Sequence, residues 1–256
     1  MISARASLAL LLLFGLAPAA FASDEPLRIA VASNFGQAAE ALLSAFRETH
    51  TGSVTLSRGS TGKLYAQIVN GAPFHVFLAA DAERPERLEK AGLAVAGSRF
   101  TYAQGRLVLW SRDPSYTDRD CVAALRDAAD AKVALANPQT APYGAAARET
   151  IEALSLWSGD RGRWVFGENV SQALQFAASG NATFGFVAAA QLRSASLPET
   201  ACRWDVPEDL HAPILQQAVL LKRGLDHPAA SSFVEFLASE PARAIIRQHD
   251  YRLGAP

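Results

Sequence analysis

The chain has 256 residues, of which 50% are hydrophobic and 19% are charged, and its formal net charge is −1 at neutral pH. A chain of this size and composition folds around a packed core, as one large domain or as two of ordinary size. The near-neutral charge, with no cluster of Lys and Arg among aromatic residues, excludes nucleic acid as a partner.

The N-terminal residues predict that the chain is exported. Arg5 precedes an apolar run from Leu8 to Leu16, and the small residues Ala20 and Ala22 stand just before a polar stretch. This order is typical of a secretory signal peptide, and the run is too short to span a bilayer. We therefore expect residues 1–22 to be removed by cleavage after Ala22. An anchoring helix is the alternative, but no second apolar stretch follows, and no cysteine stands at the cleavage site for a lipid anchor.

Beyond residue 22, short apolar strands alternate with helical segments. The clearest helix runs from Phe35 to Phe46, where apolar residues recur at helical spacing and form one continuous stripe. Strand-like runs rich in Val, Leu, Ile or Phe lie at 28–32, 53–57, 75–80, 107–111, 132–136 and 183–188. This alternation predicts an α/β fold with mostly parallel sheets.

No low-complexity tract or long linker divides the chain, so we expect two lobes with a discontinuous connection. Residues 23–105 and 213–256 would form lobe one, and residues 106–212 would form lobe two. The apolar segments 104–110 and 214–221 would be the strands that cross between them. Such a two-strand hinge allows two lobes to close around a ligand.

Four turns share one pattern, in which a strand or loop ends in small polar residues and opens a helix. They lie at 31–35, 58–63, 137–144 and 167–171. A helix N-terminus leaves its first N–H groups unbonded and carries a partial positive charge, so it attracts anions. The hydroxyls of Ser33, Ser60, Thr61 and Tyr143 would add further donors. Ordinary helix capping is the alternative explanation for each turn taken alone.

The two cysteines of the chain, Cys121 and Cys202, both lie in the part predicted to be exported. In an oxidising compartment we expect them to form a disulfide, which would stabilise the fold by roughly 4 kcal/mol. Two free buried thiols are the alternative. Neither cysteine, and none of the five histidines, stands at the spacing of a metal site.

A family resemblance is carried by these turns and their flanking residues. The stretches are 32–35 (ASNF), 59–68 (GSTGKLYAQI), 70–74 (NGAPF) with 79–81 (AAD), 141–144 (APYG) and 167–170 (GENV). As a set they resemble the periplasmic molybdate-binding proteins of ABC transporters. The stretch 233–246 is similar to the last helices of the same class II binding proteins.

The resemblance implies two Rossmann-like lobes with mixed, mostly parallel sheets joined by a two-strand hinge. It implies a monomeric periplasmic protein that binds molybdate or tungstate through neutral donors and delivers it to a membrane permease, without a cofactor or catalysis. The ligand contacts carried onto this chain are Ser33, Asn34, Ser60 or Thr61, Tyr143 and the N–H of Val170. Some relatives have a tyrosine where this chain has 185–189 (GFVAA), so Tyr143 is expected to supply the phenol.

Other ligands and functions remain open from the residues alone. A site of donors alone suits molybdate, tungstate and sulfate, whereas phosphate keeps a proton near pH 7 and calls for an acceptor. The nearby carboxylate of Asp81 is expected to cap a helix and not to contact the ligand. Another oxyanion, such as sulfate or phosphate, is the alternative ligand. A secreted hydrolase using Ser60, Asp81 and a histidine is less favoured, because no Gly-x-Ser-x-Gly motif occurs. A secreted adhesion module would need an exposed apolar patch.

Overall fold

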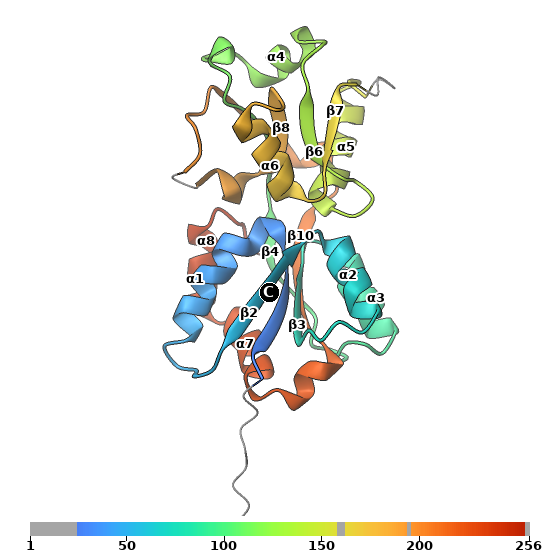
Figure 1. Cartoon of the computed structure of the whole chain (residues 1–256), viewed down its shortest axis with the longest axis vertical. Helices are drawn as coiled ribbons and strands as arrows, with labels where there is room; N and C mark the ends of the chain where they lie inside the picture. Colours follow the sequence, from blue (N-terminus) through green and yellow to red (C-terminus); the bar gives the residue numbers. More distant parts are fainter. Residues whose placement is uncertain (1–24, 158–161, 194–195, 254–256) are drawn as a thin grey trace, which may run out of the picture.

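A computed structural model describes residues 25–157, 162–193 and 196–253 of the chain. The predicted signal peptide and its cleavage site lie outside these residues. The described part forms two lobes stacked along the long axis of the molecule, each with a five-stranded sheet flanked by helices (Figure 1). Within the described residues, no helix is long and apolar enough to cross a membrane.

Lobe one is built on the sheet with strand order β2-β1-β3-β10-β4. Its strands are β1 (Leu27–Ala32), β2 (Val54–Gly59), β3 (Val76–Ala79), β4 (Phe100–Gly105) and β10 (Ile214–Leu220). β1 runs parallel to β2 and β3, whereas β10 runs antiparallel to β3 and β4. The sheet is therefore mixed, as predicted, but its parallel and antiparallel pairings are equal in number, so it is not mostly parallel.

Lobe two repeats this plan with the strand order β7-β6-β8-β5-β9. Its strands are β5 (Leu107–Ser111), β6 (Val133–Ala136), β7 (Trp164–Gly167), β8 (Phe184–Ala188) and β9 (Cys202–Asp205). β6 runs parallel to β7 and β8, and β5 runs antiparallel to β8 and β9.

Helices cover the sheets of both lobes (Figure 1). The α-helices are α1 (Gly36–Phe46), α2 (Thr61–Val69), α3 (Glu83–Lys90), α4 (Cys121–Asp127), α5 (Pro142–Ala153), α6 (Val170–Ser179), α7 (Pro228–Ala238) and α8 (Glu240–Gln248). The 3-10 helices are η1 (Ser33–Phe35), η2 (Pro114–Tyr116), η3 (Ala189–Arg193), η4 (Glu208–Leu210) and η5 (Lys222–Asp226). The predicted apolar stripe is confirmed, because its members from Phe35, at the end of η1, to Phe46, at the end of α1, are buried in the core of lobe one.

The first crossing between the lobes is short. β4 ends at Gly105 in the first sheet and β5 begins at Leu107 in the second, so Arg106 alone connects them. The chain returns through residues 206–213, between β9 and β10. The predicted segment 104–110 is thus divided between two strands, whereas β10 lies entirely in the sheet of lobe one.

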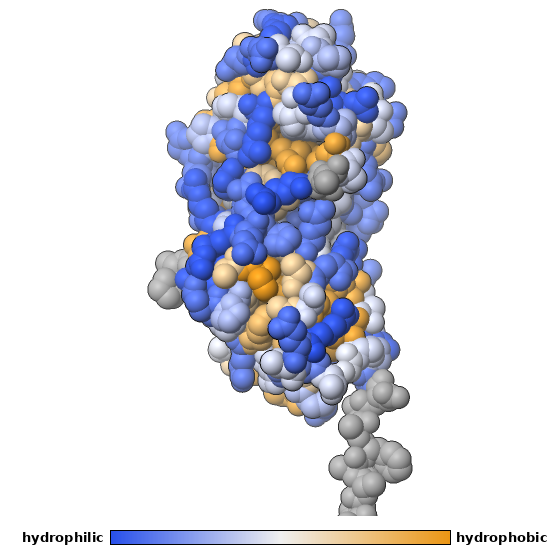
Figure 2. Space-filling model, turned by 90° about the vertical axis from the view of Figure 1, so that its left-hand side faces the viewer, coloured by the Kyte–Doolittle hydropathy of each residue, from blue (hydrophilic) through white to orange (hydrophobic). Residues whose placement is uncertain are grey.

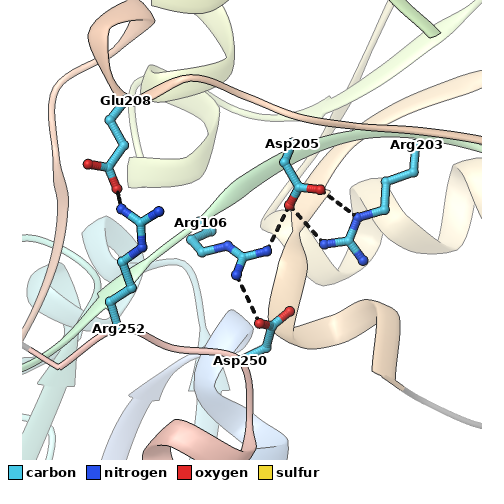
Figure 3. Close-up of polar contacts among 6 residues, drawn as sticks. All are labelled: Arg106, Arg203, Asp205, Glu208, Asp250 and Arg252. Atoms are coloured by element: carbon cyan, nitrogen blue, oxygen red, sulfur yellow. Dashed lines mark hydrogen bonds and ion pairs between the residues drawn. The ribbon is translucent and has the colours of Figure 1, made fainter. Parts of the chain in front are cut away.

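Ion pairs gather at this crossing, as Figure 3 shows. Arg106 donates to Asp205 at the end of β9 (2.8 Å) and to Asp250 after α8 (3.1 Å), so one guanidinium ties a strand of lobe two to the C-terminal part of lobe one. Arg252 pairs with Glu208 beside it. These contacts bind together the three chain segments that meet at the hinge.

The predicted disulfide is confirmed. Cys121 at the start of α4 is bonded to Cys202 at the start of β9, with their Cα atoms 5.4 Å apart. Both cysteines are buried in the core of lobe two. The bond therefore closes a loop with a sequence separation of 81 residues inside one lobe.

Candidate functional site

A small cavity lies where the two lobes face each other. It is a narrow space of about 10 Å³, room for the centre of a single water molecule. All four turns singled out from the sequence contribute to its wall. The lining residues are Ala32, Ser33, Asn34, Gly59, Ser60, Thr61, Ala80, Ala141, Pro142, Tyr143, Asn169 and Val170.

The strand register explains why the turns of lobe one meet. Ala32 at the end of β1 pairs with Gly59 at the end of the parallel strand β2. Ser33 and Ser60 directly follow these two residues, so the turns after β1 and β2 leave the same edge of the sheet side by side. In lobe two, Ala136 and Gly167 pair in the same way at the ends of β6 and β7, before the turns that open α5 and α6. Ligands of open α/β sheets bind at such carboxyl ends.

The wall of the cavity is uncharged, yet it contains two polar groups without partners. None of its lining residues is Asp, Glu, Lys, Arg or His. The hydroxyls of Ser60 and Tyr143 are buried and have no hydrogen-bond partner among the residues that the structure describes. A buried polar group without a partner costs about 1–3 kcal/mol, so native proteins rarely retain one that no ligand or water satisfies.

Ser60 and Thr61 differ in their surroundings. Ser60 stands at the N-cap position of α2, but its side chain makes no capping hydrogen bond. The hydroxyl oxygen of Thr61 accepts the N–H of Ala80 at 3.1 Å, which fixes it to the end of β3. Ser60 therefore carries the hydroxyl with no hydrogen bond within the described residues, whereas Thr61 is held in place and keeps only its O–H hydrogen to donate.

The side chain of Asn34 points into lobe one. Its amide donates to Oε1 of Gln216 at 2.9 Å and to the hydroxyl of Tyr251 at 3.0 Å. Tyr251 in turn donates to the Asn34 carbonyl at 2.8 Å. Both amide hydrogens are used in this way, which leaves the backbone N–H as the donor that Asn34 can offer to the cavity. The sequence reading does not single out Gln216 or Tyr251, which hold this turn in place.

Tyr143 reaches from lobe two into the hinge. It lies in the first turn of α5, and a Cβ placed on Gly105 would overlap its hydroxyl. Burial, and next the neighbouring Tyr251, raise the pKa of Tyr143 well above its usual value, so its hydroxyl keeps its proton at neutral pH and can donate. The glycine between Gln104 and Arg106 is the signal in the sequence that could have located this contact.

The first turn of α6 supplies a backbone donor. The side-chain oxygen of Asn169 accepts the N–H groups of Ser171 at 3.0 Å and Gln172 at 3.2 Å. This cap does not use the N–H of Val170, the first residue of the helix, which lines the cavity. The hydroxyl of Ser171 also donates to the carbonyl of Ser33 at 3.3 Å, so the two lobes touch beside the cavity.

Comparison with known proteins places this geometry in a family. Residues 27–252 match the family of bacterial extracellular solute-binding proteins. The chain belongs to this family. It is 46% identical to the molybdate-binding protein ModA of Azotobacter vinelandii over 88% of this chain and 89% of that protein. It is 45% identical to the molybdate-binding protein ModA of Rhodobacter capsulatus, over 95% and 94% of the two chains. The solved structure of the periplasmic molybdate-binding protein of Azotobacter vinelandii superposes with a TM-score of 0.83 and 39% identity, covering 90% of this chain and all of that one.

Asp81, the carboxylate considered from the sequence, is not among the residues that line the cavity of this solute-binding protein. Asp81 accepts the N–H of Arg84 at 2.9 Å and pairs with its guanidinium, as a residue before α3 that caps the helix would. Burial raises the pKa of Asp81, ahead of the opposing effect of Arg84. Because Ser60 has no base hydrogen-bonded to it within the described residues, the arrangement of a hydrolase nucleophile is not assembled there.

The surface offers no broad apolar face on the side that Figure 2 presents, where hydrophobic areas are separated by hydrophilic ones. The exposed large hydrophobic residues lie on separate elements, with Val69 on α2, Phe166 on β7 and Leu225 on η5. The described histidines, cysteines and carboxylates also form no group of three that could hold a metal ion.

Proposed function

We propose that the chain is the periplasmic component of an ABC importer, and that it captures molybdate, and with it tungstate, between its lobes for delivery to a membrane permease. The observation that carries the proposal is the pair of buried, uncommitted hydroxyls, Ser60 and Tyr143, in a cavity without charge. The printed names of the relatives, which are molybdate-binding proteins, supply the ligand class.

The proposed ligand contacts come from both lobes. Lobe one, with residues 23–105 and 213–256, contributes Ser33, the backbone of Asn34, and the hydroxyl of Ser60 with Thr61 beside it. Lobe two, with residues 106–212, contributes the phenol of Tyr143 and the N–H of Val170. Helix N-termini add a partial positive charge to these neutral donors. The anion binds only where both lobes reach it, so it draws them together.

The donor set also argues for the kind of anion. Every oxygen of molybdate, tungstate or sulfate accepts near pH 7, whereas phosphate retains a proton that needs an acceptor. The nearby carboxylate, Asp81, is engaged by Arg84. Sulfate is the second candidate, because it offers the same four acceptors and differs mainly in size.

The proposal also covers what the protein does after it binds the anion. We propose that the protein acts as a monomer, holds no cofactor and catalyses no reaction, with export by a signal peptide cleaved after Ala22. The cavity provides donors for an anion, and among its described lining residues no nucleophile is hydrogen-bonded to a base.

Isothermal titration of the mature protein with molybdate, tungstate, sulfate and phosphate tests the function directly. We expect saturable binding of molybdate and tungstate at one site per chain, weaker binding of sulfate, and none of phosphate. Tighter binding of sulfate would assign the second candidate. An absence of binding for both molybdate and tungstate would refute the proposal.

A further inference from the structure

Beside the cavity, a turn of lobe two rests on the first turn of a lobe-one helix. The turn comprises residues 137–141, between β6 and α5. The side chain of Asn137 accepts the N–H of Gln139 at 2.9 Å, and its carbonyl accepts the N–H groups of Thr140 at 3.2 Å and Ala141 at 2.9 Å. The turn is held rigidly by these bonds, and its carbonyl groups at Gln139 and Thr140 face lobe one.

Lobe one receives both carbonyl groups. The N–H of Gly62, the second residue of α2, donates to the carbonyl of Thr140 at 2.8 Å. The guanidinium of Arg84 donates to the carbonyl of Gln139 at 3.3 Å. Next to Gly62, the Lys63 ammonium lies 2.7 Å from the carboxylate of Glu168 in lobe two. We call these three contacts the clasp. Gly62, Lys63 and Arg84 are not among the groups proposed to bind the anion.

The glycine at position 62 is required by the opposite lobe and not by its own helix. A Cβ placed on Gly62 would lie 2.8 Å from the carbonyl oxygen and 3.0 Å from the Cα of Thr140. Both are backbone atoms, which cannot swing aside as the end of a long side chain can. Gly62 has no left-handed backbone conformation, and glycine in a helix is less favourable than alanine by about 1 kcal/mol.

We propose that Gly62 is a positioning residue for closure, because its missing side chain allows the clasp to form and thereby retain the anion. This inference rests on the proposed function of the cavity between the lobes. The clasp stabilises the closed form without touching the ligand, so its loss raises the rate at which the lobes open. Gly62 therefore acts mainly on the dissociation rate of the anion and little on its association rate.

The variant Gly62→Ala separates this role from a role in folding. Alanine favours α2 by about 1 kcal/mol, which offsets the loss of one interlobe hydrogen bond, so the melting temperature of the ligand-free protein should change little. We expect stopped-flow measurements with molybdate to show dissociation faster by about 10-fold, since at least one hydrogen bond of the closed form is given up. Small-angle scattering of the saturated variant should show a larger radius of gyration than that of the saturated wild type.

Gly36→Ala is the matched control. Gly36 is also at the start of a helix, but the three atoms nearest to a Cβ there all belong to the flexible side chain of Arg58, within the same lobe. We expect this variant to release molybdate at the wild-type rate. If Gly62→Ala releases molybdate as slowly as Gly36→Ala does, with an unchanged radius of gyration, the proposed role of Gly62 is wrong.

A measurement without ligand keeps this test independent of the proposed function. A carbodiimide joins Lys63 to Glu168 only while the ammonium and the carboxylate touch, and mass spectrometry of the peptides gives the yield. We expect the yield in ligand-free wild type to fall at least several-fold in Gly62→Ala and to persist in Gly36→Ala. Equal yields in all three proteins would overturn the clasp. Failure of the wild type to bind any of the four oxyanions would overturn the proposed function alone.

Discussion

The phenol of Tyr143 offers the sharpest test of the neutral binding site, because removal of its hydroxyl should weaken binding without lowering stability. In the complex the hydroxyl would donate to a dianion, and a hydrogen bond to a charged group contributes about 1.5–3 kcal/mol. Tyr143→Phe should therefore weaken molybdate binding by about 10- to 100-fold. In the ligand-free closed protein the same hydroxyl is buried and lacks a partner within the described residues. Its removal should leave the free energy of unfolding unchanged or raise it by up to about 3 kcal/mol.

The assay combines titration calorimetry with urea unfolding of the ligand-free protein. Tyr102→Phe is the matched control, because the Tyr102 hydroxyl is also buried and without a partner in the described chain, but it does not line the cavity. We expect Tyr102→Phe to bind molybdate as the wild type does. Unchanged affinity in Tyr143→Phe would refute the assignment of the phenol. An equal loss in both variants would show that the effect is not a ligand contact.

Three further perturbations test the hinge, the disulfide and the buried His75 of lobe one. Gly105→Ala should displace the phenol of Tyr143 and weaken molybdate binding at least 10-fold in calorimetry, by the same lost hydrogen bond. Replacing Cys121 and Cys202 together by serine should lower the free energy of unfolding by about 4 kcal/mol in urea, with little change in affinity. Burial lowers the pKa of His75 below 6.5, and its Nδ1 accepts the Arg28 N–H at 3.0 Å. The unfolded chain therefore takes up the proton first, so stability should fall as the pH drops below about 6.5, and urea unfolding of His75→Asn should show a smaller fall.

The sequence indicates the elements that open the site better than it indicates the side chains within it. The stripe from Phe35 to Phe46 repeats at helical spacing, and Pro142 takes the first position of α5, where proline is favoured. Turn chemistry is local, so each of the four turns could be read from a few adjacent residues. α3 is not predicted from the sequence, because its eight residues are mostly charged and only Pro85 and Leu88 are buried, which leaves no apolar stripe.

Contacts between distant residues could not be predicted in this way. The Asn34 amide is bound by Gln216 and Tyr251, which are 182 and 217 positions away. No local pattern tells that this side chain turns from the cavity, or that Thr61 and not Ser60 is held by the end of β3. The lobes also meet through Gly62 and Thr140. From the sequence alone, a glycine early in a helix indicates only a less stable helix, and its contact in the other lobe cannot be predicted.

The unsatisfied hydroxyls and the clasp act in opposite directions on the empty protein. Closing without a ligand leaves Ser60 and Tyr143 buried without partners, which favours an open form where water can reach them. The contacts made by Gly62, Lys63 and Arg84 favour the closed form whether or not an anion is present. An anion that accepts hydrogen bonds from both hydroxyls removes the cost of burying them. The stabilisation of the closed form by the clasp contacts remains. Binding of the anion then shifts the equilibrium further towards the closed form, and neither effect requires a charged residue in the cavity, where a fixed cation would slow release of the anion to a permease.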